Sequence, residues 1–275
     1  MAASSIAAEP LLACRGVCKN FGALAAVKDL SFEVRPGEVL GIGGPNGAGK
    51  TTLFEVISGL GRADSGAILF DSQDLLGLSP EAICHRGIAR TFQLNAGFDT
   101  LTTLENVLVS GQYGVSDRRW PSLVFDPALM RRARDVLDLV GLGERGGAVV
   151  RHLPVLDRKR LMIATALMTE PKLLLLDEPV GGLNPAEIDA MMALIGALPG
   201  QGVTLILIEH VMRFLVQLST RVLIMHHGEK IYEGSADGLV RDRTVVDVYL
   251  GEGASRSLGH LLADKAARDA SAARA

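Results

Sequence analysis

A glycine-rich segment is the part of this sequence best suited to chemistry. It runs from Gly44 to Thr51 as GPNGAGKT and fits the pattern G-x-x-x-x-G-K-[ST]. Its glycines allow backbone N–H groups to point inward around phosphate oxygens, above the N-terminus of a helix. Lys50 would then reach the β- and γ-phosphates of a nucleotide, and Thr51 would offer its hydroxyl to Mg²⁺. An ordinary glycine turn before a helix is the alternative, but the complete motif favours a phosphate-binding loop.

Two adjacent carboxylates, Asp177 and Glu178, follow the apolar run in PKLLLLDEP. A carboxylate at the C-terminal end of a buried strand can lie beside the glycine loop and hold Mg²⁺, directly or through water. The next carboxylate points to the opposite side, where it could orient or deprotonate an attacking water. Alone, the pair could be a charged strand end that returns to solvent. Combined with the glycine loop, it predicts a site for nucleotide hydrolysis.

His210 ends the next apolar run, VTLILIEH. Adjacent parallel strands bring their C-terminal ends to one crevice, so this side chain could reach the γ-phosphate. A single histidine at a strand end is more often a structural residue. From the residues alone, both interpretations stay open.

The segments that must position these residues alternate between strand and helix patterns. Apolar runs precede the glycine loop, the Asp-Glu pair and the histidine. Between the last two, Asn184 can cap a helix, Pro185 suits its first position and Glu187 completes a capping box. Strands that alternate with helices predict an α/β fold with a parallel sheet.

Two regions depart from this alternation. Residues 11–35 and 66–71 have the pattern of short strands separated by turns, which predicts a small antiparallel layer beside the parallel core. Residues 100–170 are mostly helical in pattern. Thr102 and Glu105 form a second capping-box candidate, and Asp126-Pro127 should begin a helix. The apolar face of that helix would contain Leu129, Ala133, Val136, Leu137 and Val140. We therefore expect an inserted helical subdomain.

Composition limits the class of protein further. The chain has 275 residues, of which 48% are hydrophobic, and its net charge is −3 from 28 basic and 31 acidic residues. No basic excess indicates binding to nucleic acid or to an anionic membrane. No apolar run approaches the roughly 20 residues that span a bilayer, and the N-terminus lacks the pattern of a signal peptide. We expect a soluble cytoplasmic chain whose three cysteines are reduced thiols rather than zinc ligands.

Several segments together resemble the nucleotide-binding subunits of ATP-binding cassette (ABC) transporters. They are GPNGAGKTTLF, GIARTFQ, LTTLENV, DEPVGGLNPAE, LIEH and VDVYLGE. Within that superfamily the chain is most similar to the ATPases of branched-chain (hydrophobic) amino-acid importers. The resemblance implies a P-loop NTPase fold with a RecA-like parallel-sheet core, a small antiparallel β layer and an inserted helical subdomain. It places the ABC ATPase domain at residues 10–252, with the helical subdomain at roughly 94–170. Residues 253–275 would be a flexible, alanine-rich tail.

The same resemblance assigns roles to individual residues, with ATP and Mg²⁺ as cofactors. Phe21 would stack on the adenine ring. Metal contacts would come from Thr51, Gln93 and Asp177, and catalysis would depend on Glu178, His210 and Lys50. The residues that contact the phosphates would be Gly44, Pro45, Asn46, Gly47, Ala48, Gly49, Lys50, Thr51 and Thr52, with Gln93 beside the metal.

The implied partners are a second ABC ATPase subunit and two transmembrane permease subunits, with a solute-binding protein outside the membrane and no nucleic acid. The chain would lie at the cytoplasmic face of the inner membrane and power import of branched-chain or other hydrophobic amino acids or related amides. Two alternatives remain: a regulatory cassette with little hydrolysis, and a soluble ABC ATPase of translation or DNA repair. Glu178 and His210 argue against the first; the single cassette and absence of basic excess argue against the second.

One motif departs from the family. The signature L-S-G-G-Q, which grips the γ-phosphate bound to the other subunit, is replaced by LPVLD at residues 153–157, and Thr165 stands where an arginine is usual. Pro154 removes a hydroxyl and a backbone donor, and Leu156 adds bulk. Asp157 adds negative charge near a phosphate, although the helix dipole would favour it as a local cap. A complete hydrolytic set beside an incomplete clamp predicts an asymmetric heterodimer.

Overall fold

The computed structural model describes residues 9–92, 97–115, 125–250 and 259 of the chain. Its strands are β1 (Leu12–Phe21), β2 (Leu24–Val34), β3 (Val39–Gly43), β4 (Ser65–Phe70), β5 (Gln73–Asp74), β6 (Ile88–Arg90), β7 (Leu173–Asp177), β8 (Thr204–Ile208), β9 (Arg221–His226) and β10 (Glu229–Gly234). Its α-helices are α1 (Lys50–Ile57), α2 (Pro80–His85), α3 (Thr103–Gly114), α4 (Pro127–Leu139), α5 (Val155–Leu167), α6 (Pro185–Ala197), α7 (Met212–Leu218), α8 (Ala236–Leu239) and α9 (Arg243–Val245). Short 3₁₀ turns lie at Gly143–Arg145, Val150–His152 and Pro199–Gln201, and a π-helix lies at Val246–Leu250.

The main sheet confirms the expected parallel α/β core. Its strand order in the described residues is β10-β9-β3-β8-β7-β6, and every neighbouring pair is parallel except β9 with β10. β3, β7 and β8 are buried along their whole length, which explains why their sequences are almost entirely apolar. Because β7 and β8 are adjacent and parallel, the segments that follow them begin at the same edge of the sheet.

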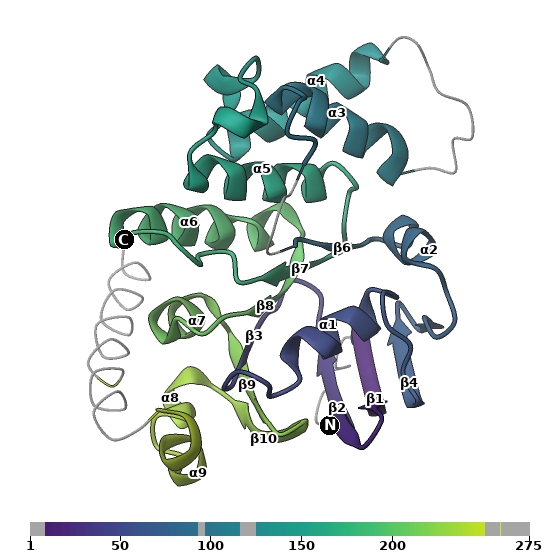
Figure 1. Cartoon of the computed structure of the whole chain (residues 1–275), viewed down its shortest axis with the longest axis vertical. Helices are drawn as coiled ribbons and strands as arrows, with labels where there is room; N and C mark the ends of the chain where they lie inside the picture. The colour runs from purple at the N-terminus through teal and green to yellow at the C-terminus, as the bar shows by residue number, and fades with distance from the viewer. Residues whose placement is uncertain (1–8, 93–96, 116–124, 251–258, 260–275) are drawn as a thin grey trace, which may run out of the picture.

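The antiparallel layer is also confirmed. β1 pairs with β2 and with β4, and β4 pairs with β5, so that the layer has the order β2-β1-β4-β5. It lies beside α1 at the opposite end of the molecule from α3 and α4 (Figure 1). Side chains of the layer, of α1 and of one face of the main sheet share a hydrophobic core.

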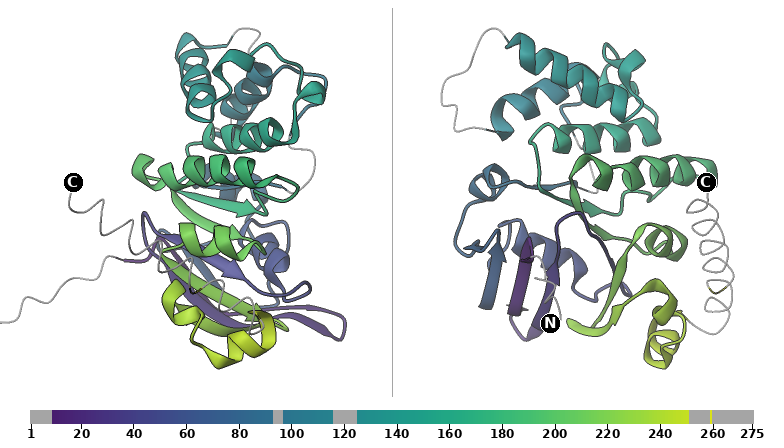
Figure 2. Two further views of the ribbon diagram at one scale, coloured as in Figure 1. Left: turned by 90° about the vertical axis from the view of Figure 1, so that its left-hand side faces the viewer. Right: turned by 180° about the vertical axis from the view of Figure 1, so that it is seen from behind.

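Helices α3, α4 and α5 form the helical region expected from the sequence, and they gather at one end of the molecule in all views (Figures 1 and 2). Both predicted capping boxes are present, at Thr102 with Glu105 and at Asn184 with Glu187. Asp126 caps α4 as predicted, with its side chain accepting from Ala128 N–H. The predicted apolar face of α4 and the start of the following loop pack into a second core, shared with α5, α6 and the other face of the sheet. The predicted tail at 253–275 lies outside the described residues, apart from Gly259.

Candidate nucleotide-hydrolysis site

The glycine loop connects β3 to α1, and its backbone needs glycine at defined positions. Gly44, Gly47 and Gly49 have φ angles of 142°, 78° and 100°. A Cβ atom on Gly44 would lie 2.2 Å from the carbonyl oxygen of Met225, and one on Gly49 would lie 2.0 Å from that of Ala26. The loop is therefore pressed between β9 and β2. A Cβ on Gly47 would meet no atom within 4 Å, so the loop is open on that side. An open loop of this shape, followed by a helix N-terminus, fits a bound phosphate chain.

Lys50 is the first residue of α1, and its ammonium is held inside the loop. Nζ donates to the carbonyl oxygens of Gly44 at 2.7 Å and Pro45 at 3.0 Å. Burial lowers the pKa of Lys50, while the nearby carboxylates of Glu178 and Asp177 act in the opposite direction. The lysine charge and both predicted carboxylates therefore belong to one electrostatic cluster. Thr51 and Thr52 follow in the first turn of α1, where Thr51 is exposed and Thr52 is half-buried.

Asp177 ends β7 and is almost fully buried, with 2% of its surface exposed. Its Oδ2 atom accepts from Arg90 at 2.9 Å, and its backbone N–H donates to the hydroxyl of Thr91 at 3.3 Å. Arg90 is the last residue of β6, and its guanidinium also lies over the rings of Phe54 and Phe92. The sequence analysis did not identify Arg90, because the pairing joins strands that are 87 residues apart in the chain.

Glu178 follows Asp177 and leaves the strand in a left-handed conformation, with φ of 47°. Its backbone N–H donates to Ile208 O at 3.0 Å, and its Oε1 atom lies 3.7 Å from Nδ1 of His210. The two side chains face each other from the ends of β7 and β8, as the sequence predicts for residues at one sheet edge. The left-handed backbone was not predicted.

One cavity of about 460 Å³ brings together five of the predicted residues. It is lined by Gly44, Pro45, Asn46, Glu178, His210, Met212 and Tyr249. The start of the glycine loop, the candidate base and the candidate histidine thus share a single space, although they come from three separate parts of the sequence. Tyr249 belongs to the π-helix, and burial raises the pKa of its hydroxyl.

Phe21 lies outside that lining. It is the last residue of β1, 54% of its surface is exposed, and Nζ of Lys19 lies 5.3 Å from its ring centroid. Its hairpin continues into β2, whose Ala26 touches the glycine loop as described above. An exposed aromatic face near the loop is compatible with adenine stacking. Gln93, predicted beside the metal, lies outside the described residues.

Glu209 and Lys159 were missed by the sequence analysis. Glu209 is fully buried, and its carboxylate accepts from the backbone N–H groups of Val180 at 3.0 Å, His210 at 3.1 Å and Val211 at 3.3 Å. Nζ of Lys159, in α5, donates to Glu178 O at 3.0 Å. A carboxylate that ends an otherwise apolar strand was a usable signal for Glu209. For Lys159, one cation among three in the segment RKR, no local signal exists.

The LPVLD segment differs from the expectation in one respect. α5 begins at Val155, with Pro154 as its N-cap and no side-chain cap bond. Asp157 does not act as the local cap; its carboxylate is buried and lies 2.6 Å from Arg145 and 3.5 Å from Arg160. The charge of Asp157 is thus neutralised within the helical region. The other two differences from the signature are unaffected by this pairing: Pro154 has no hydroxyl, and Leu156 is bulkier than glycine. Val155, at the start of the helix, is 54% exposed.

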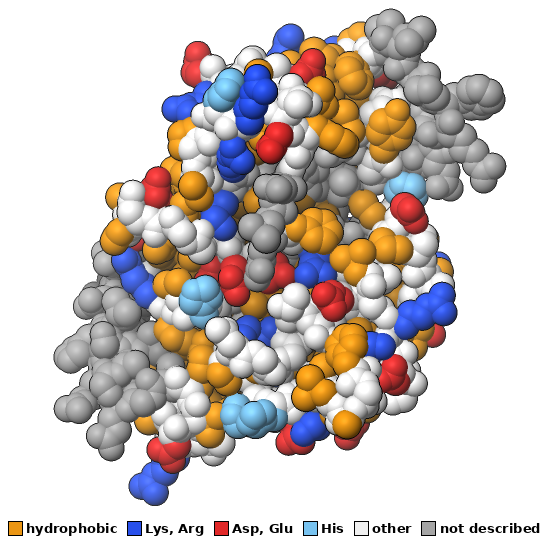
Figure 3. All heavy atoms as spheres, viewed as in Figure 1, with side chains coloured by type: hydrophobic (Ala, Val, Ile, Leu, Met, Phe, Trp, Pro, Cys, Tyr) orange, Lys and Arg blue, Asp and Glu red, His pale blue; other side chains and the backbone are white. Residues whose placement is uncertain are grey.

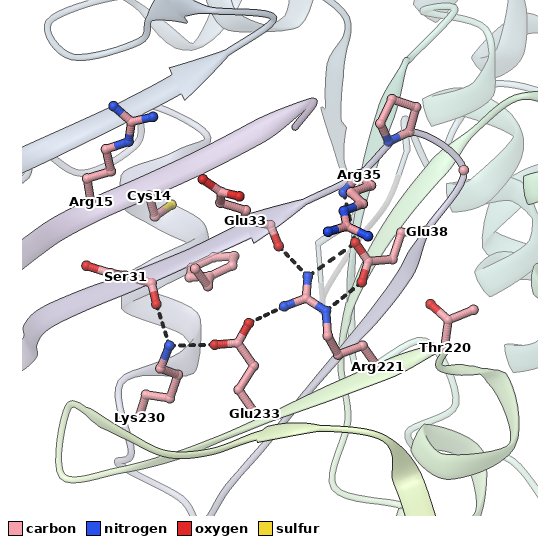
Figure 4. Close-up of a pocket in the computed structure, with 13 residues that line it drawn as sticks. Cys14, Arg15, Ser31, Glu33, Arg35, Glu38, Thr220, Arg221, Lys230 and Glu233 are labelled. Carbon is pink, nitrogen blue, oxygen red and sulfur yellow. Dashed lines mark hydrogen bonds and ion pairs between the residues drawn. The ribbon is translucent and has the colours of Figure 1, made fainter. Parts of the chain in front are cut away.

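A second cavity, of about 760 Å³, lies between β2, the start of β3 and the β9–β10 hairpin (Figure 4). Arg221 in its wall binds both carboxylate oxygens of Glu38, at 2.7 and 3.2 Å, and also contacts Glu233 and the carbonyl of Glu33. Lys230 donates to Ser31 O at 2.7 Å and pairs with Glu233. These charges bind one another across three strands, so they form a structural network rather than a ligand site.

Comparison with known proteins agrees with this geometry. A family model described as ABC transporter matches residues 27–181. The high-affinity branched-chain amino acid transport ATP-binding protein LivG of Escherichia coli K12 is 34% identical, covering 89% of this chain and 99% of that protein. Its counterpart BraF of Pseudomonas aeruginosa is 33% identical with the same coverage. A solved structure of an ATP-binding cassette of an ABC transporter in its ADP conformation has a TM-score of 0.80 and 30% identity, covering 89% of this chain and 100% of that one.

Proposed function

The chain belongs to the ABC transporter family as an ATP-binding and ATP-hydrolysing cassette related to the branched-chain amino-acid importer ATPases, and we propose that it powers import of branched-chain or other hydrophobic amino acids or related amides. The observation that carries the hydrolytic part is the single cavity shared by the glycine loop, Glu178 and His210. The transported class is supported by the names of the relatives, which are similar over almost their whole length.

The proposed chemistry is attack of water on the γ-phosphate of ATP. The glycine loop and Lys50 hold the phosphates, because an ammonium and inward-facing N–H groups stabilise negative charge there. Glu178 orients the water or takes its proton, and His210 contacts the γ-phosphate from the neighbouring strand. Lys50 must exchange its contacts with Gly44 O and Pro45 O for phosphate oxygens when ATP binds.

The residues present fit Mg²⁺ as a cofactor. Thr51 offers an exposed hydroxyl, and Asp177 offers a carboxylate whose Oδ2 atom is paired with Arg90; hydroxyl and carboxylate oxygens are the hard donors that Mg²⁺ prefers. The described residues contain no group of three or more His, Cys, Asp or Glu side chains that could hold a metal ion by themselves. Mg²⁺ characteristically binds through one or two protein ligands together with substrate phosphates, which suits so sparse a set. When bound, it would neutralise charge on the phosphates. Gln93 would complete the set.

The proposed partners are two permease subunits at the cytoplasmic face of the membrane, with a solute-binding protein on the other side. No helix in the described part of the chain is long and apolar enough to cross a bilayer. A cavity of about 330 Å³ where α2, β6, α3 and α5 meet offers a docking surface for a permease segment. Leu60 and Phe92 in its lining are about half exposed, and Thr165 lies there too. Basic and acidic side chains are interspersed on the face shown in Figure 3, which argues against a nucleic-acid partner for that face.

We further propose that the second cassette is a different chain. In a homodimer, both sites would be completed by LPVLD, which lacks the serine hydroxyl and the close glycine. In a heterodimer, this chain's Lys50, Asp177 and Glu178 would face a complete signature, and LPVLD would face the partner's ATP. The result would be one fast and one slow site.

The decisive experiment is Glu178→Gln in the assembled transporter. We expect ATP binding to remain and turnover to fall about 10²-fold or more, since only the water attack uses this carboxylate. Glu144→Gln, at an exposed carboxylate of the helical region, is the matched control and should hydrolyse normally. The corresponding substitution in the partner subunit should have a mild effect if the sites are asymmetric.

Four results would contradict parts of the proposal. Normal turnover by Glu178→Gln would remove Glu178 from the chemistry. An unaltered complex that binds ATP without turnover would support a regulatory cassette. Brisk, cooperative hydrolysis by the purified chain as a homodimer would reject the asymmetric pair, and recovery of the chain from cells without permeases would favour a soluble cassette.

A further inference from the structure

The turn after β7, residues 178–181, is held by side chains from two other elements. Lys159 approaches from α5 and donates to Glu178 O at 3.0 Å. Glu209 approaches from the end of β8 and accepts from Val180 N–H at 3.0 Å. One contact fixes a carbonyl and the other fixes an amide two residues later, so together they define the path of the turn.

The backbone of this turn is strained at Glu178, so contacts from other elements are needed to hold it. Glu178 has a left-handed backbone, which residues other than glycine adopt only at a cost. Its carbonyl accepts from Gly181 N–H at 3.3 Å as well as from Lys159, and its own N–H is bonded to Ile208 O. A strained conformation persists when its surroundings determine it, and such positions gather at catalytic sites. Here the residue is the one proposed to act on water.

Glu209 is unusual in its complete burial, and Lys159 is partly buried. A fully buried carboxylate is unfavourable unless it is hydrogen-bonded, and burial raises the pKa of Glu209 despite its backbone donors. Burial likewise lowers the pKa of Lys159, while the carboxylates of Glu209 and Glu178 oppose that shift. The two side chains therefore lie in one electrostatic environment behind the turn. An apolar pair could fill the same space without this cost, but it could not bind Glu178 O and Val180 N–H.

We propose that Lys159 and Glu209 are positioning residues for ATP hydrolysis, which hold the 178–181 backbone so that the Glu178 carboxylate faces His210. The inference deepens the proposed function and rests on its assignment of Glu178. α5 carries Lys159 only four residues after Val155, where the helix begins with the LPVLD segment. A movement of α5 relative to the sheet would change the contact with Glu178 O. Within one chain, the helical region is thus linked directly to the hydrolytic carboxylate.

The test uses steady-state ATP hydrolysis by the assembled transporter. Lys159→Met keeps the length of the side chain but removes the donor, and we expect kcat to fall about tenfold with KM for ATP nearly unchanged. Lys159→Arg keeps a cationic donor and should restore most of the rate. Lys172→Met is the matched control, because Lys172 lies just before the other end of β7, is exposed and pairs with Asp71. Glu209→Gln should resemble Lys159→Met, since its amide group would face backbone donors.

A positioning role also predicts a local structural effect. Amide hydrogen exchange at Val180 and Gly181 should become faster in both loss-of-contact variants, whereas exchange in β3 stays as in the unaltered protein. An unchanged kcat in Lys159→Met would overturn the proposal. The proposal would also be overturned if Lys159→Met lost thermal stability together with kcat and if Lys159→Arg did not restore the rate. If Glu178→Gln itself hydrolyses ATP normally, the proposed function fails; if Glu178→Gln is inactive while Lys159→Met is normal, only this inference fails.

Discussion

Replacing Gly49 by alanine should damage the protein far more than the same replacement at Gly47. Both residues lie in the glycine loop with positive φ angles, 100° and 78°, so both substitutions strain the backbone by roughly 1–2 kcal/mol. They differ in the space available for the new methyl group. At Gly49 it would lie 2.0 Å from Ala26 O, whereas at Gly47 it would meet nothing within 4 Å.

The clash at Gly49 is with backbone, so no change of rotamer relieves it. Overpacking of this kind adds about 1–3 kcal/mol to the strain of the backbone. We therefore expect Gly49→Ala to lower the free energy of unfolding by about 2–5 kcal/mol, and Gly47→Ala by about 1–2 kcal/mol.

Urea denaturation without nucleotide measures this difference independently of phosphate binding. Equal losses for the two variants would refute the reasoning, because they would show that the loop moves away from Ala26 at no cost.

Phe21→Ala should weaken ATP binding by about 1–3 kcal/mol, taking base stacking on aromatic side chains as the guide, and should weaken GTP binding similarly. Equal nucleotide affinities before and after removal of the ring, measured by calorimetry, would show that adenine stacks elsewhere. Arg145→Met should lower the free energy of unfolding by about 1–2 kcal/mol. The value is well below that for a fully buried pair, because the Arg145 side chain is 51% exposed and Arg160 still faces Asp157. Urea denaturation would detect this loss, and an unchanged stability would mean that Arg160 alone compensates the charge of Asp157.

Local chemistry explains which features the sequence predicted. The caps at Thr102 and Asn184 depend on residues three positions apart, so they could be identified before any packing was known. The glycine loop was predictable for the same reason, since its backbone requirements lie within eight residues. The common position of Glu178 and His210 followed from a general property of parallel strands.

Features that depend on distant contacts could not be predicted in this way. The pairing of Asp177 with Arg90 requires that β6 lies beside β7, and β6 has only three residues. Asp157 was expected to add negative charge near a phosphate or to act as a local helix cap, but its carboxylate pairs with Arg145 in the helical region. The left-handed backbone of Glu178 could not be predicted, because the position holds glutamate and not glycine, the residue that usually adopts this conformation. Each depends on tertiary structure that overrides local preference.

The position of β3 in the sheet has a consequence for synthesis of the chain. β3 carries the glycine loop, but its neighbours are β8 and β9, and Arg221 of β9 also binds Glu38 just before β3. Contacts of such large sequence separation form late in folding. The packing of the loop against β9 therefore becomes complete only after β9 has left the ribosome. A chain that ends before β9 contains the complete phosphate-binding sequence but lacks β9, the neighbour of β3, and the Met225 carbonyl that lies against Gly44.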